Sequence, residues 1–190
     1  MKVSSRPVQR PLLQRPLDLF YVIFLSFHLL ASLLVDGQTF YPSSWVPSAL
    51  VKVKADYLRD SNDPLIANAL APQYVWFWTA MVLEFVVQVP SFALGAWALA
   101  RDDRRFYPLL IAYSSCASVT TLQCLLTVLL GPERNTLSAE NLRTILGSYV
   151  PFFLIPTLML VDFTWRATSI IMRAERNAAV VEKANAIKSR

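Results

Sequence analysis

Four apolar stretches dominate this chain, and each is long enough to cross a lipid bilayer. They lie at about residues 17–35, 75–99, 107–130 and 148–171. About 20 apolar residues span a hydrocarbon core roughly 30 Å thick. Inside that core every backbone polar group needs a hydrogen-bond partner within the protein, so stretches of this kind form helices. We therefore expect an all-α membrane protein, a bundle of four transmembrane helices.

The distribution of charge gives the orientation and the domain boundaries. Only 16% of the residues are charged, against roughly 25% in ordinary soluble domains. The arm at residues 1–16, the link at 101–105 and the tail at 172–190 are rich in Lys and Arg. The positive-inside rule places these three segments in the cytosol, with the membrane domain at 17–171 between the arm and the tail. Because basic residues are expected beside a membrane, they do not indicate nucleic-acid binding.

The second stretch carries an acid in its middle, Glu84, with Gln88 one helical turn later. An ionisable residue at that depth costs at least ~2.5–3.5 kcal/mol on insertion scales, so it marks a site of interest. Pro90 follows and removes a backbone donor, which predicts a kink. Pro151 and Pro156 predict a second bend in the fourth stretch. Ser91 and Gly95 form a small-xxx-small pair that favours close helix packing.

The loop at residues 37–74 contains a segment, 48–60, that we expect to form a short amphipathic helix. Asp36-Gly37 precedes the loop, and we expect the glycine to end the first helix. Asp63-Pro64 follows the amphipathic segment and is typical of a turn or a helix start.

Depth along the helices brings several polar side chains to one level. At 1.5 Å per residue, His28 lies about 16 Å from one membrane surface and Glu84 about 14 Å from the other, so both are near the midplane. Asp36 and Tyr149 lie nearer the non-cytosolic surface. These positions predict a shared intramembrane cavity that runs from the midplane toward the non-cytosolic surface, below the 37–74 loop. Each residue also has an ordinary interpretation, since His28 and Glu84 can be bundle hydrogen-bonding groups, Asp36 a helix-end acid and Asp63 a cap.

The cysteines, Cys116 and Cys124, are eight residues apart in one predicted helix. That spacing separates them by roughly 12 Å along the axis, which is too far for a disulfide. With one histidine in the chain, a zinc site is also implausible. We expect neither a metal nor another cofactor.

Several motifs occur in the order and at the spacing of a known family. They are LDLFYVIFLSFHLLASLLVD, SNDPL, PQYVWF, Glu84-x-x-x-Gln88-x-Pro90, Thr120-Thr121, and Tyr149-x-Pro151 followed by Ile155-Pro156. Over about residues 14–170 the sequence thereby resembles the sigma-2 receptor (transmembrane protein 97) family. That family belongs to the EXPERA-domain superfamily together with the emopamil-binding protein, a sterol isomerase. We expect a fungal member.

The resemblance implies an endoplasmic reticulum membrane protein that forms a homodimer and holds sterols, other lipids or hydrophobic cationic amines in an occluded intramembrane pocket. Asp36 matches the acid that pairs with a ligand ammonium, and Asp63 matches a second, supporting acid. Other pocket positions of the family are matched by His28, Tyr57, Glu84, Gln88, Thr121 and Tyr149. Phe152 stands where the family has a pocket tyrosine, and Cys116-Ala117-Ser118 stand where it carries a histidine, and both differences bear on ligand selectivity.

Three functions are compatible with these features. The first is a non-enzymatic binder of sterol-like lipids and cationic amphiphilic small molecules that regulates lipid homeostasis or protein handling, with no catalytic residue. The second is a sterol 8-to-7 double-bond isomerase, in which His28 and Glu84 would supply acid and base. The third is an adaptor for mitochondrial precursor proteins at the endoplasmic reticulum surface, acting through the basic arm and tail.

Overall fold

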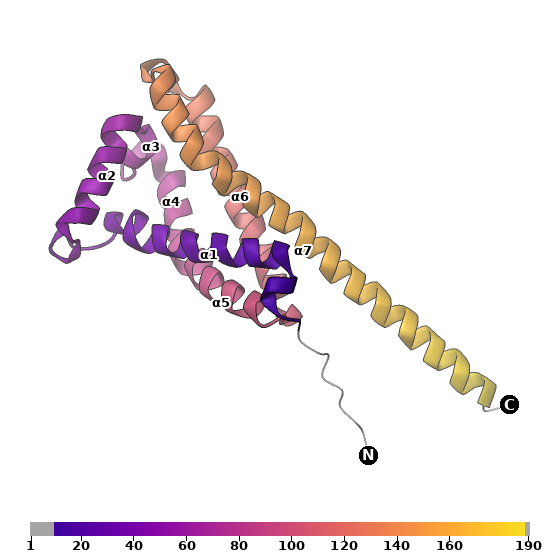
Figure 1. The fold of residues 1–190 in the computed structure, drawn as a ribbon. Helices are drawn as coiled ribbons and strands as arrows, with labels where there is room; N and C mark the ends of the chain where they lie inside the picture. Colours follow the sequence, from indigo (N-terminus) through magenta and orange to yellow (C-terminus); the bar gives the residue numbers. More distant parts are fainter. Residues whose placement is uncertain (1–9, 189–190) are drawn as a thin grey trace.

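The fold is known from a computed structural model, which describes residues 10–188 (Figure 1). No β-strand occurs among these residues. The α-helices are α1 (Pro16–Leu34), α2 (Ser48–Ser61), α3 (Pro64–Ala67), α4 (Val75–Leu83), α5 (Val89–Ala100), α6 (Tyr107–Leu130) and α7 (Ala139–Lys188). Short 3-10 helices cover Leu12–Gln14, Asp36–Thr39, Ser43–Trp45, Pro72–Tyr74, Arg104–Phe106 and Pro132–Thr136.

Four helical segments of the described chain are long and apolar enough to cross a membrane, as the sequence predicts. Their bounds are Pro16–Thr39, Pro72–Ala100, Arg104–Leu130 and Ala139–Ile187. Arg15 Nη2 donates to the Leu99 carbonyl at 2.9 Å, so the start of the first segment lies beside the end of the second. The chain is therefore an all-α, multi-pass membrane bundle.

Between α4 and α5 the helix widens into a π-helix, Glu84–Gln88. The proline expected to kink this segment, Pro90, is the second residue of α5. Because Pro90 has no N–H, the preceding turn lacks one i→i−4 bond, and a wider turn accommodates the loss. The Ser91 hydroxyl donates to the Val87 carbonyl at 2.6 Å. Such π-turns are frequent at functional sites.

The first helix ends differently from the prediction. The α-helix ends at Leu34, before Gly37, and a separate 3-10 helix, Asp36–Thr39, follows it. No glycine in residues 10–188 has a positive φ, so Gly37 does not act as a left-handed cap. A Cβ at Gly37 would lie 2.6 Å from the Tyr41 ring. The Tyr41 ring therefore packs directly on Gly37, and a larger residue there would have to displace that ring.

The expected amphipathic helix is α2, and α3 follows it after one sharp turn. Asn62 has a φ of 49° and ends α2 in the left-handed conformation. Asp63 then caps α3 by accepting from the Leu65 backbone N–H at 2.9 Å. Pro64 occupies the first turn of α3, where its missing N–H costs nothing.

Two apolar clusters hold the bundle together. One joins α1, α5, α6 and α7 through Tyr21, Phe92, Tyr113 and Phe163, and the other joins α3, α4, α6 and α7 through residues such as Leu65. In the first cluster a Cβ on Gly95 would lie 2.6 Å from Leu110 and 3.3 Å from Leu25. Close packing of α5 on α1 and α6 therefore depends on that glycine.

The fourth span is one long helix that extends beyond the bundle. α7 runs from Ala139 through both prolines to Lys188, and its last turns stand clear of the other helices (Figure 1). Residues 1–9 of the predicted arm and 189–190 of the predicted tail lie outside the described residues. The adaptor role expected for these ends stays a prediction.

Candidate functional site

A cavity of about 630 Å³ lies among α1, α2, α4, the π-helix, α6 and α7. This volume falls within the ~300–1,000 Å³ range of small-molecule sites. Residues of both apolar clusters line it. Its polar and ionisable lining residues are His28, Asp36, Thr39, Lys54, Tyr57, Glu84, Gln88, Thr120, Thr121, Cys124, Ser148 and Tyr149. Most of the others are aliphatic or aromatic, so the cavity suits a hydrophobic ligand that carries few polar groups.

His28 and Glu84 come together at one part of this cavity, as their depths predict. His28 Nε2 lies 3.9 Å from Glu84 Oε1, and the Ser32 hydroxyl donates to the same carboxylate oxygen. His28 Nδ1 is buried and has no hydrogen-bond partner among the described residues. The carboxylate thus has a protein partner, while one imidazole nitrogen remains available to a ligand or a water.

Aromatic rings surround the His28 side chain. Its ring stacks on Phe92 with centroids 4.2 Å apart, and the Phe152 ring lies 4.6 Å away at 58°. Phe24 also contacts the imidazole, at 5.5 Å. Ring faces carry negative quadrupole charge, so this wall attracts positive charge as well as apolar groups.

Asp36 lies in the 3-10 helix that follows α1, and it is half-buried. No described residue donates a hydrogen bond to its carboxylate. Lys54 of α2 lines the same cavity, and its Nζ donates to Thr39 Oγ1 at 3.2 Å. Burial lowers the pKa of Lys54, while the negative charge of Asp36 opposes that change. The cavity therefore contains a lysine whose charge interacts with that of Asp36, although no hydrogen bond or ion pair joins the two among the described residues.

Asp63 lies behind the cavity wall and does not line the cavity. Its side chain is fully buried, and its Oδ2 accepts from Tyr57 Oη at 2.8 Å and from Tyr149 Oη at 2.6 Å. Its Oδ1 caps α3. Burial and the charge of Asp63 raise the pKa of Tyr57 well above its usual range, so this hydroxyl remains a donor. Asp63 thus fixes two tyrosines that face the cavity.

Helix α7 forms another wall of the cavity. Gly147, Tyr149, Pro151 and Phe152 all line the cavity. Because Pro151 and Pro156 have no N–H, the carbonyls of Gly147 and Phe152 lose their usual i+4 helix partners. On the adjoining wall Gln88 Nε2 lies 3.8 Å from Cys116 Sγ and is buried, so this amide is already partnered by a sulfur.

Eight of the nine residues expected at the site line the cavity: His28, Asp36, Tyr57, Glu84, Gln88, Thr121, Tyr149 and Phe152. Whether they contact a ligand stays a prediction. The expectations did not include Lys54, although it precedes Tyr57 by three residues and so shares its helical face. Among residues 10–188 no group of three His, Cys, Asp or Glu side chains could hold a metal ion.

Comparisons with known proteins agree with this architecture. The family described as EXPERA (EXPanded EBP superfamily) matches residues 49–163, more than half of the 190-residue chain. Sigma intracellular receptor 2 of Xenopus tropicalis is 28% identical over 148 residues, which cover 75% of this chain and 84% of the relative. The human protein of that name is 23% identical over 160 residues, which cover 80% and 89%. His28 and Asp36 precede the family match and lie in α1 and the turn after it.

Proposed function

This chain belongs to the EXPERA family, and from that membership and the chemistry of its cavity we propose that it is a non-enzymatic binder of sterol-like lipids and hydrophobic cationic amines. The ligand enters the cavity among the membrane-spanning helices. Binding there regulates sterol and lipid homeostasis or protein handling.

One observation carries the proposal: an apolar and aromatic cavity holds an acid, Asp36, that accepts no hydrogen bond from the described residues. Even partial burial of a carboxylate without a hydrogen-bond partner carries a desolvation cost. An ammonium ligand would offset that cost through a charge-assisted hydrogen bond in a low-dielectric site. The Phe152 ring adds apolar area and cation–π attraction for the same ligand.

The proposal extends to the membrane, the orientation and the oligomeric state of the protein. We propose that the protein resides in the endoplasmic reticulum membrane, as its resemblance to the sigma-2 receptor family implies. We propose that both of its termini lie in the cytosol, because the basic segments at 1–16, 101–105 and 172–190 would then all face the cytosol. We also propose that it forms a homodimer. Cross-linking in intact membranes would test the dimer, and protease accessibility of tagged termini would test the orientation.

The decisive experiment is lipid mass spectrometry on the full chain purified gently from membranes. A sterol-like lipid should co-purify and should be displaced by a hydrophobic tertiary amine. Ala31→Phe places a large side chain in the cavity wall and should exclude the lipid. Leu122→Phe, at an exposed position of α6 that does not line the cavity, is the matched control. If the lipid co-purifies equally with both variants, it is not held in the cavity, and the proposal fails.

A second candidate, the sterol 8-to-7 double-bond isomerase, is favoured by the closeness of His28 and Glu84 and by the rings around them. Isomerisation protonates an alkene carbon and removes a different proton from the resulting carbocation, which aromatic faces stabilise. Incubation of the purified chain with an 8-ene sterol separates the two candidates, with emopamil-binding protein as positive control. We expect no 7-ene product. Product that disappears in Glu84→Gln would establish the isomerase instead.

A further inference from the structure

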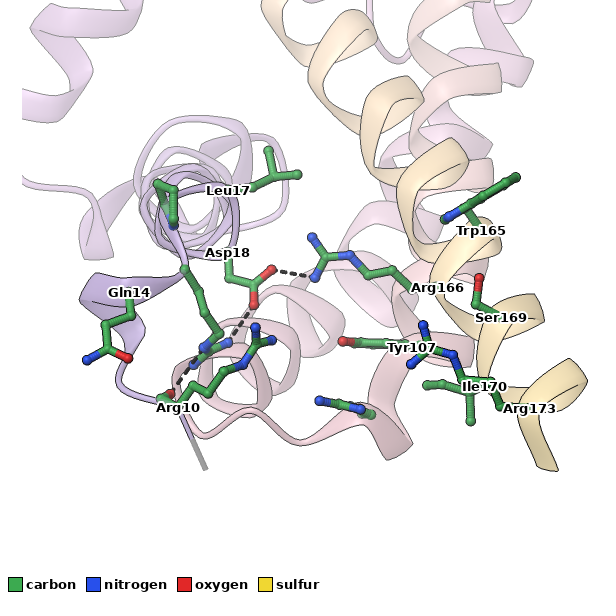
Figure 2. Close-up of a pocket in the computed structure, with 13 residues that line it drawn as sticks. Arg10, Gln14, Leu17, Asp18, Tyr107, Trp165, Arg166, Ser169, Ile170 and Arg173 are labelled. Carbon is green, nitrogen blue, oxygen red and sulfur yellow. Dashed lines mark hydrogen bonds and ion pairs between the residues drawn. The ribbon is translucent and has the colours of Figure 1, made fainter. Parts of the chain in front are cut away.

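A second pocket, of about 450 Å³, lies at the far end of the bundle from the 37–74 loop. It is lined by residues that precede α1, by the first turn of α1, by the start of α6 and by the middle of α7 (Figure 2). We call it the arginine pocket, after the five arginines in its wall: Arg10, Arg15, Arg104, Arg166 and Arg173.

One carboxylate, Asp18, sits among these cations and holds the floor of the arginine pocket. Asp18 Oδ2 accepts from Arg15 Nη1 at 2.5 Å, and its Oδ1 accepts from Arg166 Nη1 at 2.5 Å (Figure 2). Arg15 and Asp18 are both buried. Arg166 also pairs with Asp162 at 2.7 Å. The base of the pocket is therefore an ion-pair network in which both Asp18 oxygens are paired, and it connects α1 to α7.

The arginines nearer the mouth are poorly neutralised. Arg10 and Arg104 share one acid, Asp102, at 3.7 Å and 3.8 Å, and buried Arg15 also approaches it at 3.9 Å. The Arg173 guanidinium has no ion pair or hydrogen bond among residues 10–188. Five arginines thus face three carboxylates, Asp18, Asp102 and Asp162, so the pocket keeps an excess of two positive charges. Such an excess around a hollow favours an anion.

Exposed apolar side chains flank the same mouth. Leu17, Trp165 and Ile170 line the pocket and are 45%, 75% and 39% exposed. They continue the apolar outer surfaces of α1 and α7, and tryptophan is enriched where a membrane-spanning helix meets the headgroup layer. An occupant of this mouth therefore meets arginines on one side and acyl-chain surface on the other. A phospholipid has both parts, whereas a free anion has one.

We propose that the arginine pocket binds the phosphate-bearing headgroup of an anionic phospholipid. Guanidinium groups hold phosphate oxygens in bidentate geometry, and basic pockets between membrane-spanning helices suit such headgroups. Arg104 and Arg173 contact the phosphate, while Arg15 and Arg166 hold the floor. This site is separate from the proposed sterol cavity and does not depend on it.

The test uses the full chain in phosphatidylcholine nanodiscs and measures binding of a short-chain phosphatidylinositol phosphate by native mass spectrometry. Short-chain phosphatidylcholine and inorganic phosphate are the comparison ligands. In the Arg104→Gln/Arg173→Gln variant we expect affinity for the anionic lipid to fall on the order of 10- to 30-fold, about five-fold per arginine. Arg176→Gln removes the same charge from α7, one turn beyond Arg173 and outside the pocket, and should leave the affinity unchanged.

Each other outcome overturns the proposal. Equal binding of phosphatidylcholine would show that the headgroup charge is not recognised. Equal saturation by inorganic phosphate would identify a free-anion site. An equal loss in Arg176→Gln would indicate general surface attraction. Thermal unfolding in phosphatidylcholine nanodiscs, without the anionic lipid, checks that the double variant is folded. If it is not, the single variant Arg173→Gln, at an exposed position, is used for the same binding measurement.

Discussion

The hydroxyl of Tyr149 donates a 2.6 Å hydrogen bond to Asp63, which joins α7 to the turn between α2 and α3. Tyr57 donates to the same carboxylate oxygen from α2. Through this acid the loop above the bundle is attached to the helix that forms one wall of the cavity. The contact therefore sets both the position of the loop and the direction of two cavity-lining hydroxyls.

Removing the buried carboxylate should destabilise the protein more than removing either tyrosine hydroxyl. Asp63→Ala leaves two hydroxyls and the capped N–H groups of α3 without an acceptor, and we expect a loss of about 3 kcal/mol or more. Tyr149→Phe should cost about 1 kcal/mol, because Tyr57 still satisfies Asp63. Thermal unfolding in detergent measures both, with Tyr41→Phe as a control expected to change little. Equal losses for Asp63→Ala and Tyr149→Phe would contradict the central role of the acid.

Asp36→Asn should remove most of the affinity for hydrophobic amines and leave the fold intact. The carboxylate accepts no hydrogen bond from residues 10–188, so the isosteric amide leaves no protein donor unsatisfied. A hydrogen bond to a charged group contributes about 1.5–3 kcal/mol, which predicts a loss of at least ten-fold. Competition binding measures it. Asp56→Asn, on the outer face of α2 beside Lys52 and Arg59, is the matched control and should bind like the wild type.

Lys54→Leu should change amine affinity in the opposite direction. Lys54 lines the cavity and interacts with Asp36, so its cationic head competes with a ligand ammonium for the same acid. Like charges roughly 8 Å apart repel by about 2 kcal/mol at an effective dielectric near 20, so removing the lysine charge should strengthen amine binding roughly 30-fold. Lys52→Leu, 74% exposed and paired with Asp56, should leave affinity unchanged. Weaker amine binding in Lys54→Leu would show that the lysine assists the ligand.

Two glycines should respond oppositely to added side chains. Gly95→Val places a side chain against fully buried Leu110, and we expect a loss of about 1–3 kcal/mol from overpacking. Apart from its chain neighbours and the backbone of its own helix, a methyl group added at Gly147 would meet no described atom within 4 Å, so Gly147→Ala should stabilise α7 by up to about 1 kcal/mol. Thermal unfolding of the two variants side by side checks both signs.

The membrane-spanning segments and α2 could be predicted from the sequence because their signals are local. Twenty or more apolar residues require a helix wherever they occur in a bilayer, and the pattern at 48–60 is amphipathic within a single helix. The meeting of His28 and Glu84 was predictable for a related reason. A helix has a fixed rise per residue, so the distance of each residue from a span end gives its depth.

Features that depend on packing between distant segments could not be predicted in this way. Asp18 lies three residues after Arg15, so that pair is local. Arg166 reaches the same carboxylate across 148 residues only because α1 and α7 pack together. Pro90 marks a disturbed helix, but whether the chain kinks or widens into a π-turn depends on its neighbours. Asp63 has the spacing of a helix cap and acts as one. Its second role, to Tyr149, requires contact across 86 residues.

Helix α7 contributes residues to the walls of both pockets. Its two prolines lie beside the cavity, and Arg166 lies ten residues beyond Pro156, or about 15 Å along the axis. A tilt of roughly 10° at that proline would displace Arg166 by about 2.5 Å, a distance comparable to the length of its contact with Asp18. The ion pair between Arg166 and Asp18 therefore requires a fixed angle of α7 at its proline segment, because even a small bend there would separate the two side chains.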